Sequence, residues 1–177
     1  MTETAVEIAA SVRAGRITAR AATEAALGRI AERDAQLGAF QRVRAEAALQ
    51  EADAVDARPD RAQLPLAGVP IAIKDNVPVA GEPMRVGSAG SDPAPQQRDH
   101  AVVALLRNAG AVIVGLTAVP ELCVFGAPAS PFGTSRNPWH PAHTPGGSSG
   151  GSAAAVSAGM APIEHGNEGM GPTPHPP

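Results

Sequence analysis

Apolar residues recur at helical spacing through the first part of the chain, residues 1–62. Thr4 and Glu7 have the spacing of a capping box, in which the two side chains satisfy backbone N–H groups at the start of a helix. A second helix is expected from Thr18, and a third from about residue 44 to residue 56. The pattern therefore predicts a helical lead-in.

The pattern changes at Pro65, where short apolar runs bounded by proline and glycine begin. The runs at 68–73 and 111–116 are rich in β-branched residues, which is typical of buried strands. Asp99 is the expected N-cap of a helix between these two strands. A further helix of small residues is expected over 150–159.

Alternation of strands and helices after a helical lead-in predicts an α/β fold. We expect N-terminal helices followed by the first part of a mixed, partly parallel sheet that is flanked by helices. The expected divisions are a lead-in over 1–62, an α/β core over 63–171 and a proline-rich tail over 172–177. Residues 126–147 hold five prolines and are expected to form a long loop.

Composition narrows the class of protein. Of the 177 residues, 44% are hydrophobic and only 2% are aromatic, so the core is built from small aliphatic side chains. The net charge of −3 and the scarcity of aromatic residues argue against a nucleic-acid partner. No apolar run has the length of a membrane span, and Cys123 is the only cysteine, so we expect a cytoplasmic protein with no membrane partner.

The segment from Thr144 to Ser152 reads Thr-Pro-Gly-Gly-Ser-Ser-Gly-Gly-Ser. Its glycines allow backbone and hydroxyl groups to approach a ligand closely, and N–H groups at the start of the next helix could face an oxyanion. A flexible linker is the plain alternative, although linkers rarely run straight into a helix. A phosphate-binding loop would need a lysine followed by serine or threonine after the glycines, which this segment lacks.

The same segment matches the G-x-S-x-G pattern of a nucleophile elbow, with Ser149 as the nucleophile. An elbow requires a strand directly before the serine. Pro138, Pro141 and Pro145 cannot form a central strand, so the pattern argues against this alternative.

Lys74 is the single lysine beside thirteen arginines, and it ends the apolar run of the first predicted strand. Burial disfavours a charged ammonium, which can make a neutral amine available as a base. The competing interpretations are a lysine that extends to solvent or one that pairs with Asp75. The position of Lys74 alone does not decide among them.

Four segments in order resemble the amidase signature family: Gly68-Val-Pro-Ile-Ala-Ile-Lys-Asp-Asn, Gly110-Ala-Val-Ile-Val-Gly-Leu-Thr, Asn137-Pro-Trp and Gly146-Gly-Ser-Ser-Gly-Gly-Ser. The resemblance extends from Thr4 to Gly171. It implies a Ser-Ser-Lys mechanism that cleaves a small-molecule amide without a metal or other cofactor. In this mechanism Lys74 matches the base and Ser148 matches a bridging serine that follows a cis peptide bond.

The resemblance further implies that the bridging serine activates a nucleophilic serine in a second glycine-rich loop. Ser149, Gly169, Met170 and Gly171 match the loops that bind substrate and donate to the oxyanion. The nucleophile position itself is occupied by Pro172. Proline has no hydroxyl to attack with and no N–H to donate, so we expect this chain to be inactive.

A frameshift near codon 172 is our hypothesis for this departure. The tripeptide Pro-His-Pro that begins at Pro174 can be encoded CCG-CAT-CCC, which read one base later begins Arg-Ile-Pro, as members of the family commonly continue. Two classes of function stay open at this point. One is an amidase by ancestry that lacks its nucleophile, and the other is a non-catalytic remnant that uses the Gly/Ser loop for binding. Neither the amide substrate nor the oligomeric state follows from the sequence.

Overall fold

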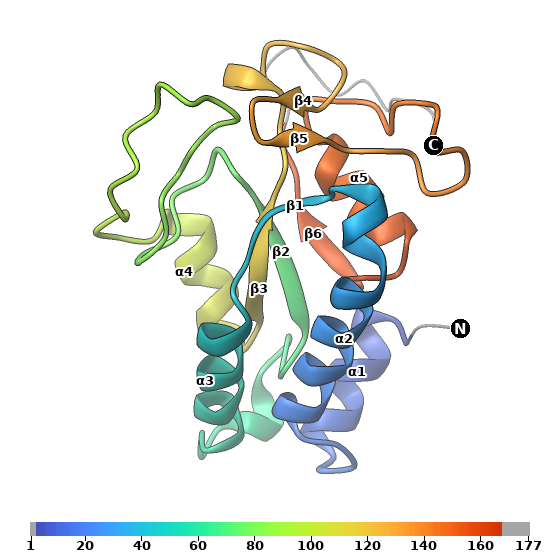
Figure 1. Ribbon diagram of the computed structural model, residues 1–177. Coiled ribbons are helices and arrows are strands. Elements are labelled where there is room, and N and C mark those ends of the chain that lie inside the picture. The colour runs from blue at the N-terminus through green and yellow to red at the C-terminus, as the bar shows by residue number, and fades with distance from the viewer. Residues whose placement is uncertain (1–2, 168–177) are drawn as a thin grey trace.

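The computed structural model describes residues 3–167 (Figure 1). The helices are α1 Ala5–Arg13, α2 Ala19–Leu37, α3 Ala45–Asp56, α4 Ala101–Asn108 and α5 Gly150–Ser157. The strands are β1 Phe40–Val43, β2 Pro70–Lys74, β3 Val112–Thr117, β4 Ala129–Ser130, β5 Gly133–Thr134 and β6 Ile163–His165. Short 3-10 turns occur at Arg61–Gln63 and Glu121–Cys123.

The first two helices begin where the sequence predicts. The Thr4 N–H donates to the Glu7 carboxylate at 2.8 Å, and the Glu7 N–H donates to the Thr4 hydroxyl at 3.3 Å. Thr18 caps α2 by accepting from the Ala21 N–H at 3.0 Å. These bonds satisfy N–H groups that have no partner within the helix, so they fix the point at which each helix begins.

Within residues 3–167, four strands form the main sheet in the order β1-β3-β2-β6. Strand β2 is parallel to β3 and to β6, whereas β1 is antiparallel to β3. The predicted α/β class with a mixed, partly parallel sheet is confirmed. The predicted helical lead-in over 1–62 also contains a strand, because β1 lies within it and pairs with the edge of β3.

Apolar side chains on both faces of β2 and β3 build two clusters. On one face, residues such as Val112 and Ala72 pack with helices α1, α2, α3 and α5. On the other face, Ile71, Ile73 and Ile113 pack against α4. The sheet is therefore covered on both sides, as expected for parallel strands that are apolar throughout.

A β-bulge in β3 determines on which face of the sheet the side chains of its last residues lie. Ile71 pairs with Ile113, but the next residue, Ala72, pairs with Gly115, so β3 holds one extra residue. Beyond the bulge, Thr117 is the partner of Lys74. Its hydroxyl lies 2.6 Å from that of Ser152 in α5, and both residues are buried. The bulge thus places a polar residue under α5.

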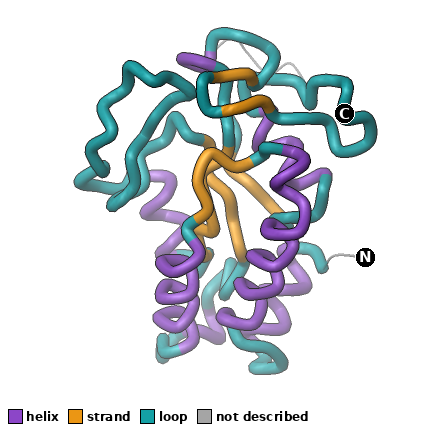
Figure 2. Tube along the Cα trace, in the orientation of Figure 1, coloured by secondary structure: helices purple, strands orange, loops and turns teal. Residues whose placement is uncertain are grey.

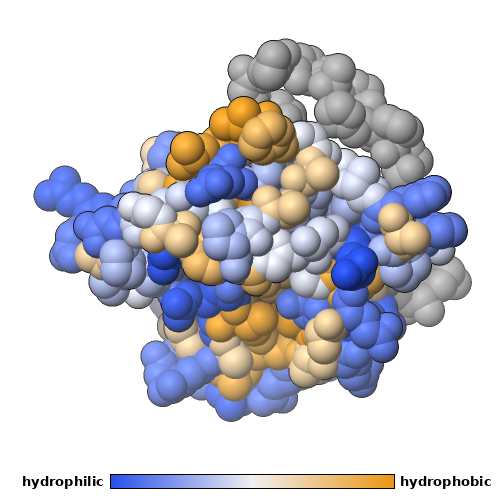
Figure 3. Space-filling model, turned by 45° about the horizontal axis from the view of Figure 1, so that its top comes forward, coloured by the Kyte–Doolittle hydropathy of each residue, from blue (hydrophilic) through white to orange (hydrophobic). Residues whose placement is uncertain are grey.

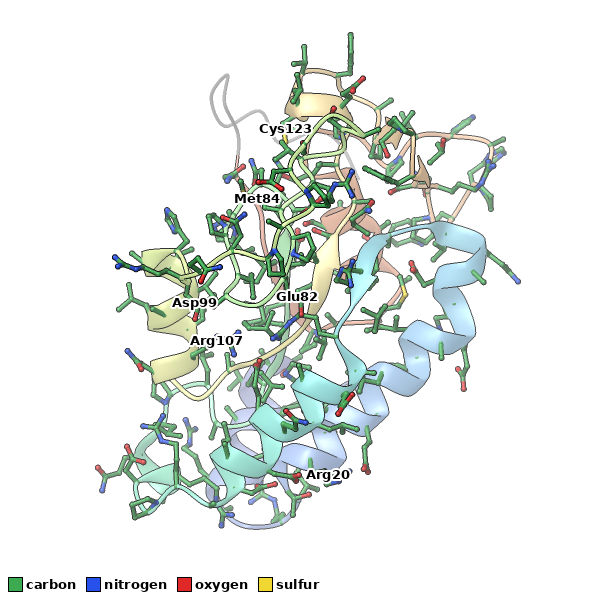
Figure 4. The ribbon with its side chains drawn as sticks, turned by 60° about the vertical axis from the view of Figure 1, so that its left-hand side comes forward. Arg20, Glu82, Met84, Asp99, Arg107 and Cys123 are labelled. Carbon is green, nitrogen blue, oxygen red and sulfur yellow. The ribbon has the colours of Figure 1, made fainter. Side chains whose placement is uncertain are left out.

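Charged side chains tie α3, α4 and the loop after β2 to the sheet. Arg44 pairs with Glu51 and Glu82 at 2.8 Å each and donates to the Ile113 carbonyl at 2.7 Å. Arg107 pairs with Glu51 at 2.5 Å and with Asp99 at 2.9 Å. Figure 4 shows Asp99 and Arg107 beside α4 and Glu82 on the neighbouring loop.

Asp99 does not cap α4, contrary to the sequence prediction. The N-cap is His100, whose ring accepts from the Val102 N–H at 3.2 Å. The Asp99 carboxylate instead accepts from the Ala80 N–H at 2.7 Å. It therefore holds the loop after β2 in place, which a pattern of capping residues could not reveal.

Loops gather at one end of the sheet, beyond the carboxyl ends of β2 and β3 (Figure 2). The predicted long loop over 126–147 lies there and contains only the small hairpin of β4 and β5. Hydrophobic side chains are exposed on this end of the molecule, among them Leu122, Val124 and Phe125 (Figure 3). No helix within residues 3–167 is long and apolar enough to cross a membrane.

Two helical glycines should respond oppositely to the same substitution. A Cβ at Gly151 in α5 would lie 2.4 Å from the Ala118 carbonyl oxygen, whereas a Cβ at Gly28 in α2 would meet nothing within 4 Å. We expect Gly151→Ala to lower the free energy of unfolding by about 1–3 kcal/mol through overpacking. We expect Gly28→Ala to raise it by roughly 0.5–1 kcal/mol through helix propensity. Urea unfolding measures both, and equal effects of the two changes would contradict the close packing of α5.

Candidate active site

Lys74 is the last residue of β2, and its side chain is completely buried. It lies beside Thr117, its partner on β3, at the carboxyl end of the parallel strands. In open α/β sheets this end is where ligands bind. An amine removed from solvent needs protein atoms as its hydrogen-bond partners.

The first of these partners is Ser148. The Lys74 Nζ donates to the Ser148 Oγ at 2.8 Å, although the two residues are 74 positions apart in the sequence. The peptide bond between Gly147 and Ser148 is cis. Gly147 has no room for a side chain, since a Cβ there would lie 2.8 Å from the backbone of Gly126. The glycine-rich segment therefore follows a path close to the neighbouring loop and brings Ser148 to the amine.

The backbone carbonyl of Asn167 is the second partner. It accepts from the Lys74 Nζ at 2.6 Å and from the Ser149 hydroxyl at 3.0 Å. Asn167 follows β6, whose pairing with β2 brings it to the same end of the sheet. One carbonyl oxygen thus receives hydrogen bonds from the lysine and from the serine next to Ser148.

Two carboxyl groups lie near Lys74. Burial raises the pKa of Asp75 to about 6, against the opposing effect of backbone N–H groups of Arg85 and Val86. Burial also raises the pKa of Glu164 to about 7, against the opposing effect of the positive charge of Lys74. The Glu164 Oε2 is buried and has no hydrogen-bond partner within the described part of the chain. Near neutral pH, Glu164 therefore carries only part of a full negative charge.

The structure brings together the three predicted site residues that it describes. Lys74 and Ser148 are in direct contact, and Ser149 begins α5 beside them. Ser149 follows a loop and not a strand, so the geometry of a nucleophile elbow is absent there. The predicted oxyanion residues and the nucleophile position, which are Gly169, Met170, Gly171 and Pro172, lie outside the described residues.

The sequence did not predict that Asn76, Asn167 and Glu164 lie at the site around Lys74. Asn76 follows Lys74 by two positions, and its side chain contacts that of Asn167. Asn167 could have been singled out only through its place in the second glycine-rich loop. Glu164 carried no signal, because a lone glutamate near a short strand is usually exposed.

The family model named Amidase matches residues 21–173, which is most of the chain. The chain belongs to the amidase family. It is 51% identical over 159 residues to AmiB2 of Mycobacterium tuberculosis, which is named as an amidase, and this match covers 89% of the chain and 34% of AmiB2. It is 50% identical over 137 residues to AmiA2 of Mycobacterium bovis, also named as an amidase, and this match covers 76% of the chain and 28% of AmiA2.

Solved structures of the family share the fold. The structure of 6-aminohexanoate cyclic dimer hydrolase with its substrate matches with a TM-score of 0.85 and 31% identity, covering 93% of this chain and 33% of the other. A bacterial aryl acylamidase of the amidase signature family matches with a TM-score of 0.84 and 28% identity, and this match covers 92% of this chain and 34% of the acylamidase. The chain spans only 28–34% of the length of the two amidases AmiA2 and AmiB2.

The buried carboxyl of Glu164 predicts a pH dependence of stability. Its pKa rises from 4.5 to about 7 on folding, so between these values the folded protein holds a proton that the unfolded chain releases. Rising pH therefore lowers the free energy of unfolding across this window. The free energy of unfolding should therefore fall less between pH 5 and pH 8 in Glu164→Gln than in the wild type, by about 1–2 kcal/mol.

Urea unfolding at the two pH values measures this effect. Asp75 still titrates in the wild type, in Glu164→Gln and in the control variant named next. The free energy of unfolding should therefore still depend on pH in all three proteins. Glu32→Gln, on the exposed surface of α2, is the matched control and should leave the slope unchanged. An identical slope in Glu164→Gln and the wild type would show that Glu164 titrates normally.

Proposed function

We propose that the amidase domain to which this chain corresponds hydrolyses a carbon–nitrogen amide bond, with Lys74 as the base and Ser148 as the bridging serine. The observation that carries this proposal is the 2.8 Å contact between the buried Lys74 amine and the Ser148 hydroxyl. Membership of the amidase family supports the same reaction class. A buried lysine beside a serine is the arrangement that proton transfer requires.

The proposed reaction begins with a neutral Lys74 amine, which accepts the proton of the Ser148 hydroxyl. Ser148 in turn takes the proton of a nucleophilic serine, whose oxygen attacks the amide carbonyl. The carbon–nitrogen bond breaks as the proton held by the pair passes to the leaving amine, which leaves an acyl-enzyme. Water then hydrolyses the ester with the same pair moving its proton, and the enzyme is restored.

The burial of Lys74 supports the proposal of a neutral amine. Desolvation penalises the ammonium form of a fully buried lysine. The Glu164 carboxylate would stabilise that form, but burial raises the pKa of Glu164 to about 7 against the opposing effect of the charge of Lys74. Glu164 therefore retains its proton at a higher pH than usual, which weakens its support for the ammonium.

The present chain should itself be inactive toward amides, because Pro172 offers no hydroxyl where the nucleophile is needed. We expect the purified 177-residue protein to show no turnover of a panel of aliphatic and aromatic amides, measured as released amine. Ser148→Ala should be indistinguishable from the parent. Turnover that is lost in Ser148→Ala would instead assign a nucleophilic role to that serine.

A chimera tests the proposed roles directly. Residues 1–171 would be joined to a serine and to the downstream part of AmiB2, whose matching third is 51% identical. We expect amide hydrolysis by this protein to fall by roughly 10²–10⁴-fold in Lys74→Ala and in Ser148→Ala. Lys74→Arg should be nearly as damaging, since guanidinium stays protonated and cannot act as a base.

The controls separate chemistry from folding. A chelator should leave the rate unchanged, since we expect no metal in the reaction. Arg33→Lys, at an exposed position of α2, should retain the parental rate. Full activity in Lys74→Arg would show that Lys74 is not the base.

A further inference from the structure

The side chains of Asn76 and Asn167 form a reciprocal amide pair. The Asn76 Nδ2 donates to the Asn167 Oδ1 at 2.9 Å, and the Asn167 Nδ2 donates to the Asn76 Oδ1 at 3.2 Å. Asn76 lies in the turn after β2, and Asn167 follows β6. The pair therefore joins two loops at the carboxyl end of the sheet.

This pair closes a ring of hydrogen bonds through Lys74. The backbone N–H of Asn76 donates to the Lys74 carbonyl at 2.8 Å, which folds the turn tightly behind the lysine. The Lys74 Nζ donates to the Asn167 carbonyl at 2.6 Å. Moving Asn167 away from the lysine would therefore break both the amide pair and the bond to the amine.

A carbonyl oxygen can only accept hydrogen bonds, so each group that bonds to the Asn167 carbonyl must point one of its hydrogens at it. A neutral amine has two hydrogens and one lone pair. A neutral Lys74 amine can rotate about its Cε–Nζ bond and still keep one N–H on the Asn167 carbonyl, which turns the lone pair, in place of the second N–H, toward the Ser148 hydroxyl, 2.8 Å away. The Ser149 hydroxyl donates its proton to the same carbonyl. Ser148, and not Ser149, is then the serine that can give its proton to the amine.

We propose that Asn76 and Asn167 act as one positioning unit, which holds the Asn167 carbonyl against Lys74 and so directs the amine toward Ser148. Its importance for catalysis rests on the proposed roles of Lys74 and Ser148. The unit itself is a property of the folded chain. It can be tested without any turnover.

The single lysine makes the test specific. A small amine-acylating reagent can modify only Lys74 and the α-amine of the chain, and mass spectrometry distinguishes the two. Lys74 is completely buried, so it reacts only when the loops above it open locally. The α-amine serves as the internal reference. The ratio of the two rates in the native protein therefore measures how firmly the loops are held over Lys74.

We expect Asn76→Ala and Asn167→Ala each to raise the relative rate at Lys74 by roughly fivefold, about the equilibrium factor that one net hydrogen bond contributes. The double variant should react no faster than either single variant, because each change already breaks the pair. Asn108→Ala, at an exposed asparagine that ends α4, is the matched control and should leave the rate unchanged.

Unchanged rates in both single variants would overturn the proposal, as would effects that simply multiply in the double variant. Faster labelling that tracks a lower urea midpoint would also overturn it, since it would indicate general destabilisation. If an alanine variant fails to fold, Asn76→Ser and Asn167→Ser replace it, because serine stays polar but is too short to bridge the loops. Full activity of the chimera that carries Lys74→Arg would refute the base role of Lys74 and leave these labelling results unaffected.

Discussion

The burial of one lysine amine is the constraint on which the rest of this structure depends. An amine without water needs acceptors from the protein, and each unpaired buried polar group is costly. Lys74 obtains its acceptors from Ser148 and from the carbonyl of Asn167, which come from two later segments of the chain. Those segments must return to the end of β2, and they do so through the glycine-rich turn and through strand β6.

Small residues make this return possible. Helix α5 begins directly after the two serines and lies close to the sheet, with the Gly151 N–H donating to the Ala118 carbonyl. A bulkier helix could not approach so closely. The ion pairs of Arg44 and Arg107 act on the opposite side, where they hold the loop after β2. The lysine therefore lies between a packed helix and a loop fixed by charge.

Much of the fold could be predicted from local patterns, whereas the site was predictable only in part. The start of α1 at Thr4 follows from capping chemistry, and strands β2 and β3 follow from their apolar runs. Strand β1 was missed because four residues at the edge of a sheet carry little periodic signal. The resemblance supplied Lys74 and Ser148. The Asn76–Asn167 pair joins loops that are distant in the sequence, so it has no local signature.

The bulge in β3 has a consequence for how the end of this strand can vary. Leu116 packs with the α4 side, and Thr117 meets Ser152 on the α5 side, because one extra residue shifts the alternation of the strand. The polarity under α5 is thus set by how β3 pairs with β2 beyond the bulge as much as by its residues. Loss of the extra residue, Val114, would leave a regular ladder in which Leu116 still pairs with Ile73 and Thr117 still pairs with Lys74, so both would keep their faces. An apolar substitution of Thr117 would therefore change the polarity under α5 more than the loss of Val114.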